Sequence, residues 1–315
     1  MGRKLRGFWD VLAEAGDEFI EDHASKLSAS LAYYALFSIG PLLLVMITLM
    51  GFFYKRAYMT TQIFDQVRGI IGANATTQLQ TILVNMNLQT NKTLIGIAGI
   101  VVFIFGATGI FSEIQSSMNY IWSIKAKPKR SWLKYLRDRL LSLVLVIGMG
   151  FLMMVTILIN IVVDITSNRF RQFLGDADIV LLKAVNFGLL FVVVTLVFFV
   201  IFKVLPDAWI HWKDALVGAV FTSVLFIVGK YLISYYFSFS KSLNLYGAAT
   251  SIILVLSWVY YSSMILYYGA EFTEAYAHLH GRGIKVKNNA VHILKHETTV
   301  LEPRKKARPD ATDKG

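Results

Sequence analysis

The chain has no cysteine, few prolines and little charge. Its 315 residues include no Cys and only 5 Pro, and Asp, Glu, Lys and Arg together make up 16%. The absence of cysteine excludes disulfide bonds, thiolate nucleophiles and metal sites built on Cys. Soluble domains carry about 25% charged residues, so the shortage of charge is not typical of one.

Motifs for catalysis and nucleotide binding are also missing. There is no Walker loop, no G-x-G-x-x-G turn, no H-E-x-x-H pair and no arrangement of Ser, His and Asp typical of a hydrolase. His292 and His296 are four residues apart, but they lie in a polar tail with no pre-organised acidic ligand. We therefore expect no enzyme, no catalytic residue, no cofactor and no metal site.

Hydrophobic residues are in excess and are gathered into long runs. They make up 56% of the chain, and the mean hydropathy is +0.56. A helix of about 20 apolar residues spans the roughly 30 Å hydrocarbon core of a bilayer. The runs predict an all-α, polytopic membrane bundle within residues 31–276. Its six transmembrane helices are expected at about 31–53, 94–110, 140–163, 179–202, 215–237 and 248–270.

The segments on either side of the bundle are polar. Within residues 1–30, apolar side chains such as Phe8, Trp9 and Leu12 recur with helical spacing among six acidic ones, which predicts an interfacial amphipathic helix. Anionic lipid attracts Lys and Arg and would repel an acidic helix, so such a helix needs a basic neighbour in the protein. We hypothesise that it docks on the basic segment Lys125–Arg139. The alternative is that its carboxylates are simply solvated. Residues 277–315 are polar and basic, and we expect a disordered cytoplasmic tail.

The net charge is +11. In a soluble protein this would suggest nucleic acid as a partner, but in a membrane protein it follows from the bias of Lys and Arg toward cytoplasmic loops. With the N-terminus inside, the inner segments hold 22 Lys and Arg and the outer loops hold 7. The charges therefore predict both termini in the cytoplasm and no nucleic-acid partner. The stretch Gly106–Leu141, in which an apolar run is followed by basic residues, is the strongest marker of this orientation.

Charged residues at membrane depth are costly and are the first candidates for function. Lys230 lies inside the fifth predicted span, where its stem either snorkels outward or reaches a buried partner. A second group is expected to converge at the cytoplasmic side, and its members are Glu113, Arg137, Arg139, Lys203 and Glu271. This group is either a gate or binding site for a charged solute or lipid headgroup, or an ion-pair network that ties helix ends together.

Four segments, taken together and in order, resemble the YihY/BrkB family of bacterial inner-membrane proteins. They are LAYYALFSIGPLLL at 31–44, the segment 113–122 with its Asn-Tyr-Ile-Trp end, 205–232 and 246–272. The family pattern falls on Tyr33, Pro41, Asn119, Trp122, Pro206, Gly229, Lys230, Tyr246, Gly247 and Glu271.

This resemblance implies six spans and a place in the bacterial inner membrane. Members of the family carry labels such as virulence factor, serum-resistance factor and ribonuclease BN. Cleavage of a phosphodiester needs metal-binding carboxylates or a His pair in a polar site. The cytoplasmic segments offer neither at a useful spacing, so we do not expect ribonuclease activity.

Two functions fit these observations. We favour transport or channel-like handling of a small or lipid-like solute, because charged residues lie at membrane depth. The alternative is a non-catalytic envelope scaffold that positions other proteins. The expected partners are the lipid bilayer and such a solute, and a homo-oligomer is left open.

Overall fold

The computed structural model of the chain describes residues 2–51, parts of 60–80, 93–127, most of 132–151, 177–239, 249–280, 283–287 and 290–293. The described part is mostly helical. Its helices are α1 (Gly2–Glu21), α2 (Ala24–Gly51), α5 (Thr93–Ile121), α7 (Ala177–Val204), α8 (Trp212–Phe239) and α9 (Ala249–Leu279), and residues 132–145 form a further helix.

Three of the described helices contain stretches that are long and apolar enough to cross a membrane. These stretches are Phe187–Val204 in α7, Trp212–Ile233 in α8 and Ile253–Leu279 in α9. They fall on the fourth, fifth and sixth predicted spans. Residues 52–53 of the first predicted span and 152–163 of the third lie outside the described residues.

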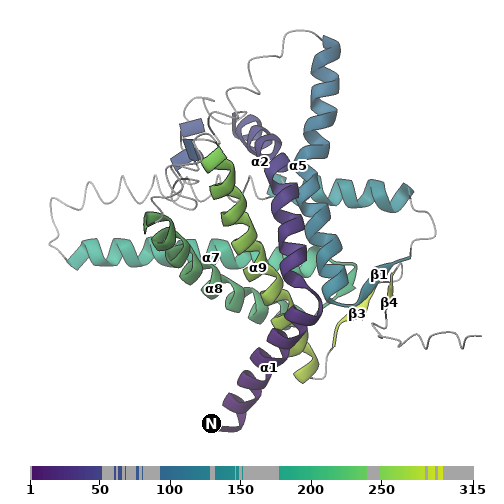
Figure 1. The fold of residues 1–315 in the computed structure, drawn as a ribbon, viewed down its shortest axis with the longest axis vertical. Coiled ribbons are helices and arrows are strands. Elements are labelled where there is room, and N and C mark those ends of the chain that lie inside the picture. The colour runs from purple at the N-terminus through teal and green to yellow at the C-terminus, as the bar shows by residue number, and fades with distance from the viewer. Residues whose placement is uncertain are drawn as a thin grey trace, which may run out of the picture.

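Helices α1 and α2 are separated by a sharp turn, and α1 packs on α9 (Figure 1). His23 in this turn has a φ of 52°, a left-handed conformation that L side chains rarely adopt, so the helix is interrupted here. Val11 and Ala15 of α1 pack against Phe272 and Ala275 of α9. The apolar face of α1 thus lies on α9. Docking of its acidic face on Lys125–Arg139 stays a prediction, since residues 128–131 lie outside the described residues.

Helices α8 and α9 interlock through two glycines. A Cβ on Gly218 of α8 would lie 1.9 Å from Oγ1 of Thr273, and a Cβ on Gly269 of α9 would lie 1.9 Å from Oγ1 of Thr222. Each threonine also donates a hydrogen bond to the glycine four residues before it, which holds its side chain in place. Small residues at such positions let two helices approach closely in the membrane.

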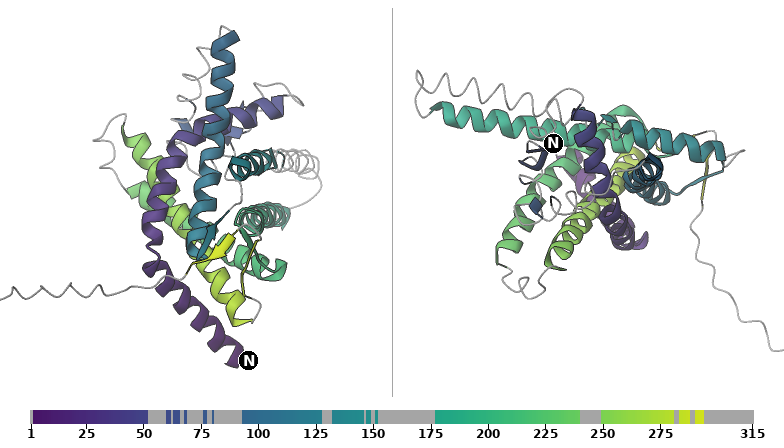
Figure 2. Two further views of the ribbon diagram at one scale, coloured as in Figure 1. Left: turned by 90° about the vertical axis from the view of Figure 1, so that its right-hand side faces the viewer. Right: turned by 90° about the horizontal axis from the view of Figure 1, so that it is seen from above.

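The helices are not all aligned with one another. Figures 1 and 2 show α7 running across α2 and α5 rather than alongside them. The main core lies where these elements meet, around Met118 and Trp122 of the α5 end, Phe202 of α7 and Tyr267 of α9. The indole N–H of Trp122 donates to the carbonyl of Ala270 at 3.1 Å, which ties α5 to α9.

Two small antiparallel sheets were not predicted. β1 (Ile124–Ala126) pairs with β4 (Ala290–His292), and β2 (Ala208–Trp209) pairs with β3 (Lys285–Val286). The strands lie at one end of the molecule, below α5 and beside the last turns of α9 (Figure 1), and we call this the strand end. The expectation of a disordered tail from 277 is wrong for residues 283–287 and 290–293, because backbone pairing with distant loops orders them. Residues 294–315 lie outside the described residues.

Candidate functional site

A polar cleft of about 300 Å³ lies at the strand end. Its walls come from the last turns of α5, the 132–145 helix and the short connector after α7. The lining residues are Ser112, Gln115, Ser116, Asn119, Ala126, Lys134, Tyr135, Asp138, Arg139 and Asp207. We call it the Asp207 cleft, because Asp207 receives more hydrogen bonds than its neighbours.

Asp207 is held by four side chains, and its own side chain is only 4% exposed. Lys134 Nζ lies 2.6 Å from Oδ2, and Arg137 Nη2 lies 3.2 Å from Oδ1. Asn119 donates from Nδ2 to Oδ2 at 3.0 Å and accepts the backbone N–H of Asp207 at 2.8 Å. Gln115 Nε2 completes the set at 3.5 Å. Two cations and two amides thus replace the water that an ionised carboxylate would otherwise bind.

Local structure explains why these side chains meet. Gln115 and Asn119 are four residues apart on α5 and therefore share one of its faces. Lys134 and Arg137 lie on the 132–145 helix, which follows β1 in the chain. Lys134 also forms a salt bridge with Asp138 on this helix, at 3.0 Å. Asp207 comes directly after Pro206, which cannot continue α7, so the connector turns its carboxylate toward the other two segments.

The C-terminal segment 283–287 also binds the connector that carries Asp207. The backbone N–H of Lys287 donates to the carbonyl of Asp207 at 3.1 Å, and its Nζ donates to the carbonyl of Pro206 at 2.6 Å. Burial lowers the pKa of Lys287; Asp207 opposes this, while the nearby charges of Arg137 and Lys134 add to it. Lys287, the residue after β3, therefore adds another cation beside the connector that carries Asp207.

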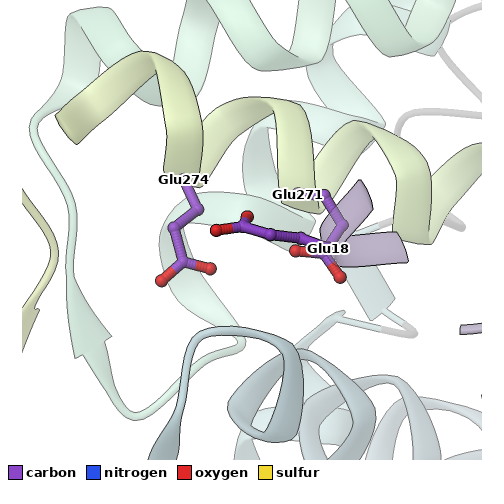
Figure 3. Close-up of side chains that lie close together, drawn as sticks. All are labelled: Glu18, Glu271 and Glu274. Atoms are coloured by element: carbon purple, nitrogen blue, oxygen red, sulfur yellow. The ribbon is translucent and has the colours of Figure 1, made fainter. Parts of the chain in front are cut away.

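A separate group of carboxylates lies between α1 and α9. Glu271 and Glu274 extend from α9 toward Glu18 of α1 (Figure 3), and one oxygen of each lies within 4.8 Å of the others. Glu271 is fully buried. Burial, followed by the charges of Glu274, Glu14 and Asp22, raises the pKa of Glu18 to about 7, and His278 opposes the shift.

Carboxylates this close together repel one another unless a proton or a cation lies between them. The raised pKa of Glu18, caused first by burial and then by neighbouring carboxylates, means that Glu18 holds its proton more tightly than an exposed Glu does. Carboxylate oxygens are also ligands for hard cations, and Glu18, Glu271 and Glu274 are the only described residues with a spacing that suits one.

The predicted cytoplasmic group is divided between several places. Arg137 binds Asp207, and Arg139 lines the same cleft while donating to Thr108 and Tyr135. The other three do not line this cleft: Glu113 accepts a hydrogen bond from Ser30 of α2, Lys203 donates to the carbonyl of Ile210, and Glu271 faces α1. Of the residues expected to converge, Arg137 and Arg139 lie near Asn119 at the Asp207 cleft. Glu113, Lys203 and Glu271 lie elsewhere.

Lys230 lies half-buried in α8, with Nζ 5.8 Å from the ring centroid of Tyr231. No carboxylate among the described residues forms a salt bridge with it. The preceding Gly229 is a contact point, since a Cβ there would lie 2.4 Å from the hydroxyl of Tyr261. Lys230 therefore stands beside a close approach of α8 and α9.

The remaining predicted positions either lie within helices away from the cleft or lie outside the described residues. Tyr33 is exposed and packs edge-on against Tyr34 and Phe37. Pro41 lies within α2, which continues to Gly51. Tyr246 and Gly247 lie outside the described residues.

Asp207, Lys134 and Gln115 were not singled out from the sequence. The signal that could have found Asp207 is a carboxylate directly after the Leu-Pro pair that ends a span. Lys134 was counted only as one of the basic residues of its segment. Lys134 pairs with Asp207, which lies 73 residues further along the chain. The local sequence around Lys134 does not predict that contact.

The long apolar helices and the polar cleft at their ends define a helical membrane protein. The chain belongs to the virulence factor BrkB family, whose sequence model matches residues 15–292. That match includes the last part of α1, from residue 15, the other helices named above and both strands of the C-terminal segment.

Individual relatives match over most of their length. The chain is 28% identical to the putative ribonuclease-like protein YfkH of Bacillus subtilis, over 89% of this chain and 99% of the relative. It is 26% identical to a UPF0761 membrane protein of Tolumonas auensis, over 80% of each chain. With a UPF0761 membrane protein of Aliivibrio salmonicida it shares 28% identity, over 98% of this chain and 96% of the relative. No solved structure gives a significant match.

Proposed function

We propose that this protein handles a small or lipid-like solute at the bacterial inner membrane, by transport or a channel-like mechanism. In this proposal the chain crosses the membrane six times with both termini in the cytoplasm, and α1 lies at the interface. The strand end then faces the cytoplasm, and the Asp207 cleft is where the solute is bound on that side.

The observation that carries the proposal is the Asp207 cleft itself. Ligand sites in proteins are concave, and a few convergent polar groups give them specificity. Here a buried carboxylate, its cations and the hydroxyls of Ser112 and Ser116 border one cleft at the end of apolar helices. A network that served only to tie helix ends together would not need a hollow of about 300 Å³ beside it.

Two further residues belong to the proposal. Lys230 is a charged group within α8, and charged groups inside a bilayer commonly mark a solute or ion path. Glu271 is a buried carboxylate next to Ala270, whose carbonyl accepts the hydrogen bond from Trp122 at the end of α5. We assign both to the path by which the solute leaves the cleft, and we assign no nuclease chemistry to any of these residues.

The test is solute flux in proteoliposomes. Wild-type protein and the variant Asp207→Asn are reconstituted, and uptake is followed for a panel of small anions, cations, zwitterions and labelled phospholipids. Asn keeps the size of the side chain but removes the charge that binds Lys134 and Arg137. We expect the wild type to move at least one member of the panel, and Asp207→Asn to move it at least about tenfold more slowly.

Asp17→Asn is the matched control, because Asp17 is an exposed carboxylate of α1. It should leave flux unchanged. A wild-type protein that is folded and correctly reconstituted but moves no member of the panel would contradict the proposal. So would equal flux through wild type and Asp207→Asn.

A further inference from the structure

We propose that the ligand of the Asp207 cleft carries a phosphate group, either as a small phosphorylated solute or as the headgroup of a phospholipid. This inference rests on the proposed function, because it concerns the same cleft. It adds the chemical class of the ligand, which the proposed function leaves open.

The charges of the cleft favour an anion. Among the described residues, four cations line the cleft or bind the Asp207 connector: Lys134, Arg137, Arg139 and Lys287. Only two carboxylates lie with them, and both Asp207 and Asp138 are already within 3.0 Å of Lys134. The lining residues themselves carry two positive and two negative charges. Arg137 and Lys287 add two positive charges beside the cleft, and these attract an anion, since low-dielectric walls strengthen the field inside a cleft.

The donors of the cleft match a phosphate more closely than a carboxylate. Ser112 and Ser116 lie one turn apart on α5, and Arg139 faces the same cleft from the 132–145 helix. A carboxylate offers two oxygens in one plane, whereas a phosphate offers three or four in a tetrahedron. Hydroxyls from one helix and a guanidinium from another can therefore bind different oxygens of one phosphate.

The size and position of the cleft fit both sources of such a group. A volume of about 300 Å³ is at the small end for ligand sites, so it suits a headgroup or a small solute rather than an acyl chain. The helix that carries Lys134 and Arg139 exposes Trp132, Leu136 and Leu140. These side chains recur every four residues along one apolar face, beside which the acyl chains of a bound phospholipid would lie.

Binding measurements on the full-length protein test this inference and separate the two sources. In detergent, inorganic phosphate and glycerol 3-phosphate are titrated by calorimetry, with chloride and acetate as comparison anions. In nanodiscs, retention of phosphatidylglycerol against a diacylglycerol of the same chains is measured by native mass spectrometry. We expect at least one phosphate-bearing probe to bind more tightly than its phosphate-free counterpart.

Three variants locate the site. Arg139→Gln should weaken binding of that probe about tenfold or more, and Arg139→Lys should recover part of the loss, because it restores the charge without the fork. Lys213→Gln removes an exposed cation that stacks on Trp212 outside the cleft, and it should change nothing. Thermal melting of each purified variant shows whether it is folded.

Every outcome bears on the inference. If phosphate and its comparison anions bind equally and phosphatidylglycerol is not retained, the inference is wrong. It is also wrong if folded Arg139→Gln binds as the wild type does. If a solute without phosphate is transported and its flux depends on Asp207, the proposed function stands and this inference is wrong. If a phosphate-bearing probe binds but no solute is transported, this inference stands and the proposed function is wrong.

Discussion

Asp207 is a buried carboxylate, and removing such a group from water costs several kcal/mol unless partners compensate. Lys134 is the stronger partner, because its side chain is 14% exposed and its Nζ is 2.6 Å away. The side chain of Arg137 is 53% exposed, so solvent screens its share. Loss of one partner from a buried pair costs about 3–5 kcal/mol, and Asp207→Asn removes the charge while keeping the size of the side chain.

Glu18 makes the stability of the molecule depend on pH. Its pKa rises from 4.5 to about 7 in the folded chain, so the folded state holds this proton more tightly than the unfolded state. Stability should therefore fall as the pH rises from about 4.5 to about 7, and should change no further through this group above that range. Melting temperatures between pH 4.5 and 8 measure the effect.

Glu18→Gln mimics the protonated carboxyl, so its melting temperature should exceed that of the wild type at pH 8 and approach it at pH 4.5. Asp17→Asn, one residue away on the exposed face of α1, should keep the pH dependence of the wild type. If Glu18→Gln and wild type lose stability in parallel over this range, the raised pKa of Glu18 is not the cause.

At the level of single residues, the sequence indicated two of the cations around Asp207, Arg137 and Arg139, but neither Lys134 nor Asp207 itself. Arg137 and Arg139 stand in a dense basic segment before an apolar run, which is a local pattern. Asn119 was found through a family motif. Asp207 binds side chains 70 to 92 residues away in the chain, and its role exists only after those segments have packed.

At the scale of elements, α8 and α9 approach each other closely at two glycines, Gly218 and Gly269. Thr222 and Thr273 each occupy the space that a side chain on the opposite glycine would need. Gly218→Ala or Gly269→Ala should therefore push the helices apart and destabilise the protein by about 1–3 kcal/mol. Denaturant or thermal unfolding in detergent measures this loss.

Gly188→Ala is the matched control, since a Cβ at this exposed position of α7 would meet nothing within 4 Å. It should be neutral or stabilising by up to about 1 kcal/mol, because alanine favours a helix over glycine. Combining Gly218→Ala with Thr273→Ala should recover part of the loss. A double variant no more stable than Gly218→Ala alone would show that the clash with Thr273 is not responsible.

The long elements could be predicted and the short ones could not. The described bounds of α5, α7, α8 and α9 lie close to the apolar runs, because a run of about 20 apolar residues has few alternatives to a helix. Strands of two and three residues such as β2 and β1 carry no measurable periodicity. They form because residues 285–292 come back to pair with them, which is a property of the tertiary structure.

At the scale of the whole molecule, this C-terminal segment joins two loops that are far apart in the chain. β4 pairs with β1 before the 132–145 helix, and β3 pairs with β2 after α7. The N–H of Ile293 also donates to the carbonyl of Ser123 at 2.7 Å. Ala126 and Asp207, which these contacts hold, both line the cleft.

A chain ending at residue 282 should therefore keep α8 and α9 and lose order at the cleft. Hydrogen exchange at 124–126 and 205–209 should become faster, while exchange in the α8–α9 contact should be unchanged. A chain ending at residue 293 keeps all four strands and serves as the control. Equal protection of 124–126 in both truncated chains would show that the C-terminal strands do not hold this loop.

The position of β3 and β4 in the chain also sets a time order. Residues 285–292 are synthesised after every described helix, so α1 to α9 are already made before the connector at Asp207 receives its last backbone hydrogen bond. Until then the described hydrogen bonds that join Asp207 to the other walls of the cleft are those to the side chains of Gln115, Asn119, Lys134 and Arg137. The growing protein thus completes its membrane helices first and its polar site last.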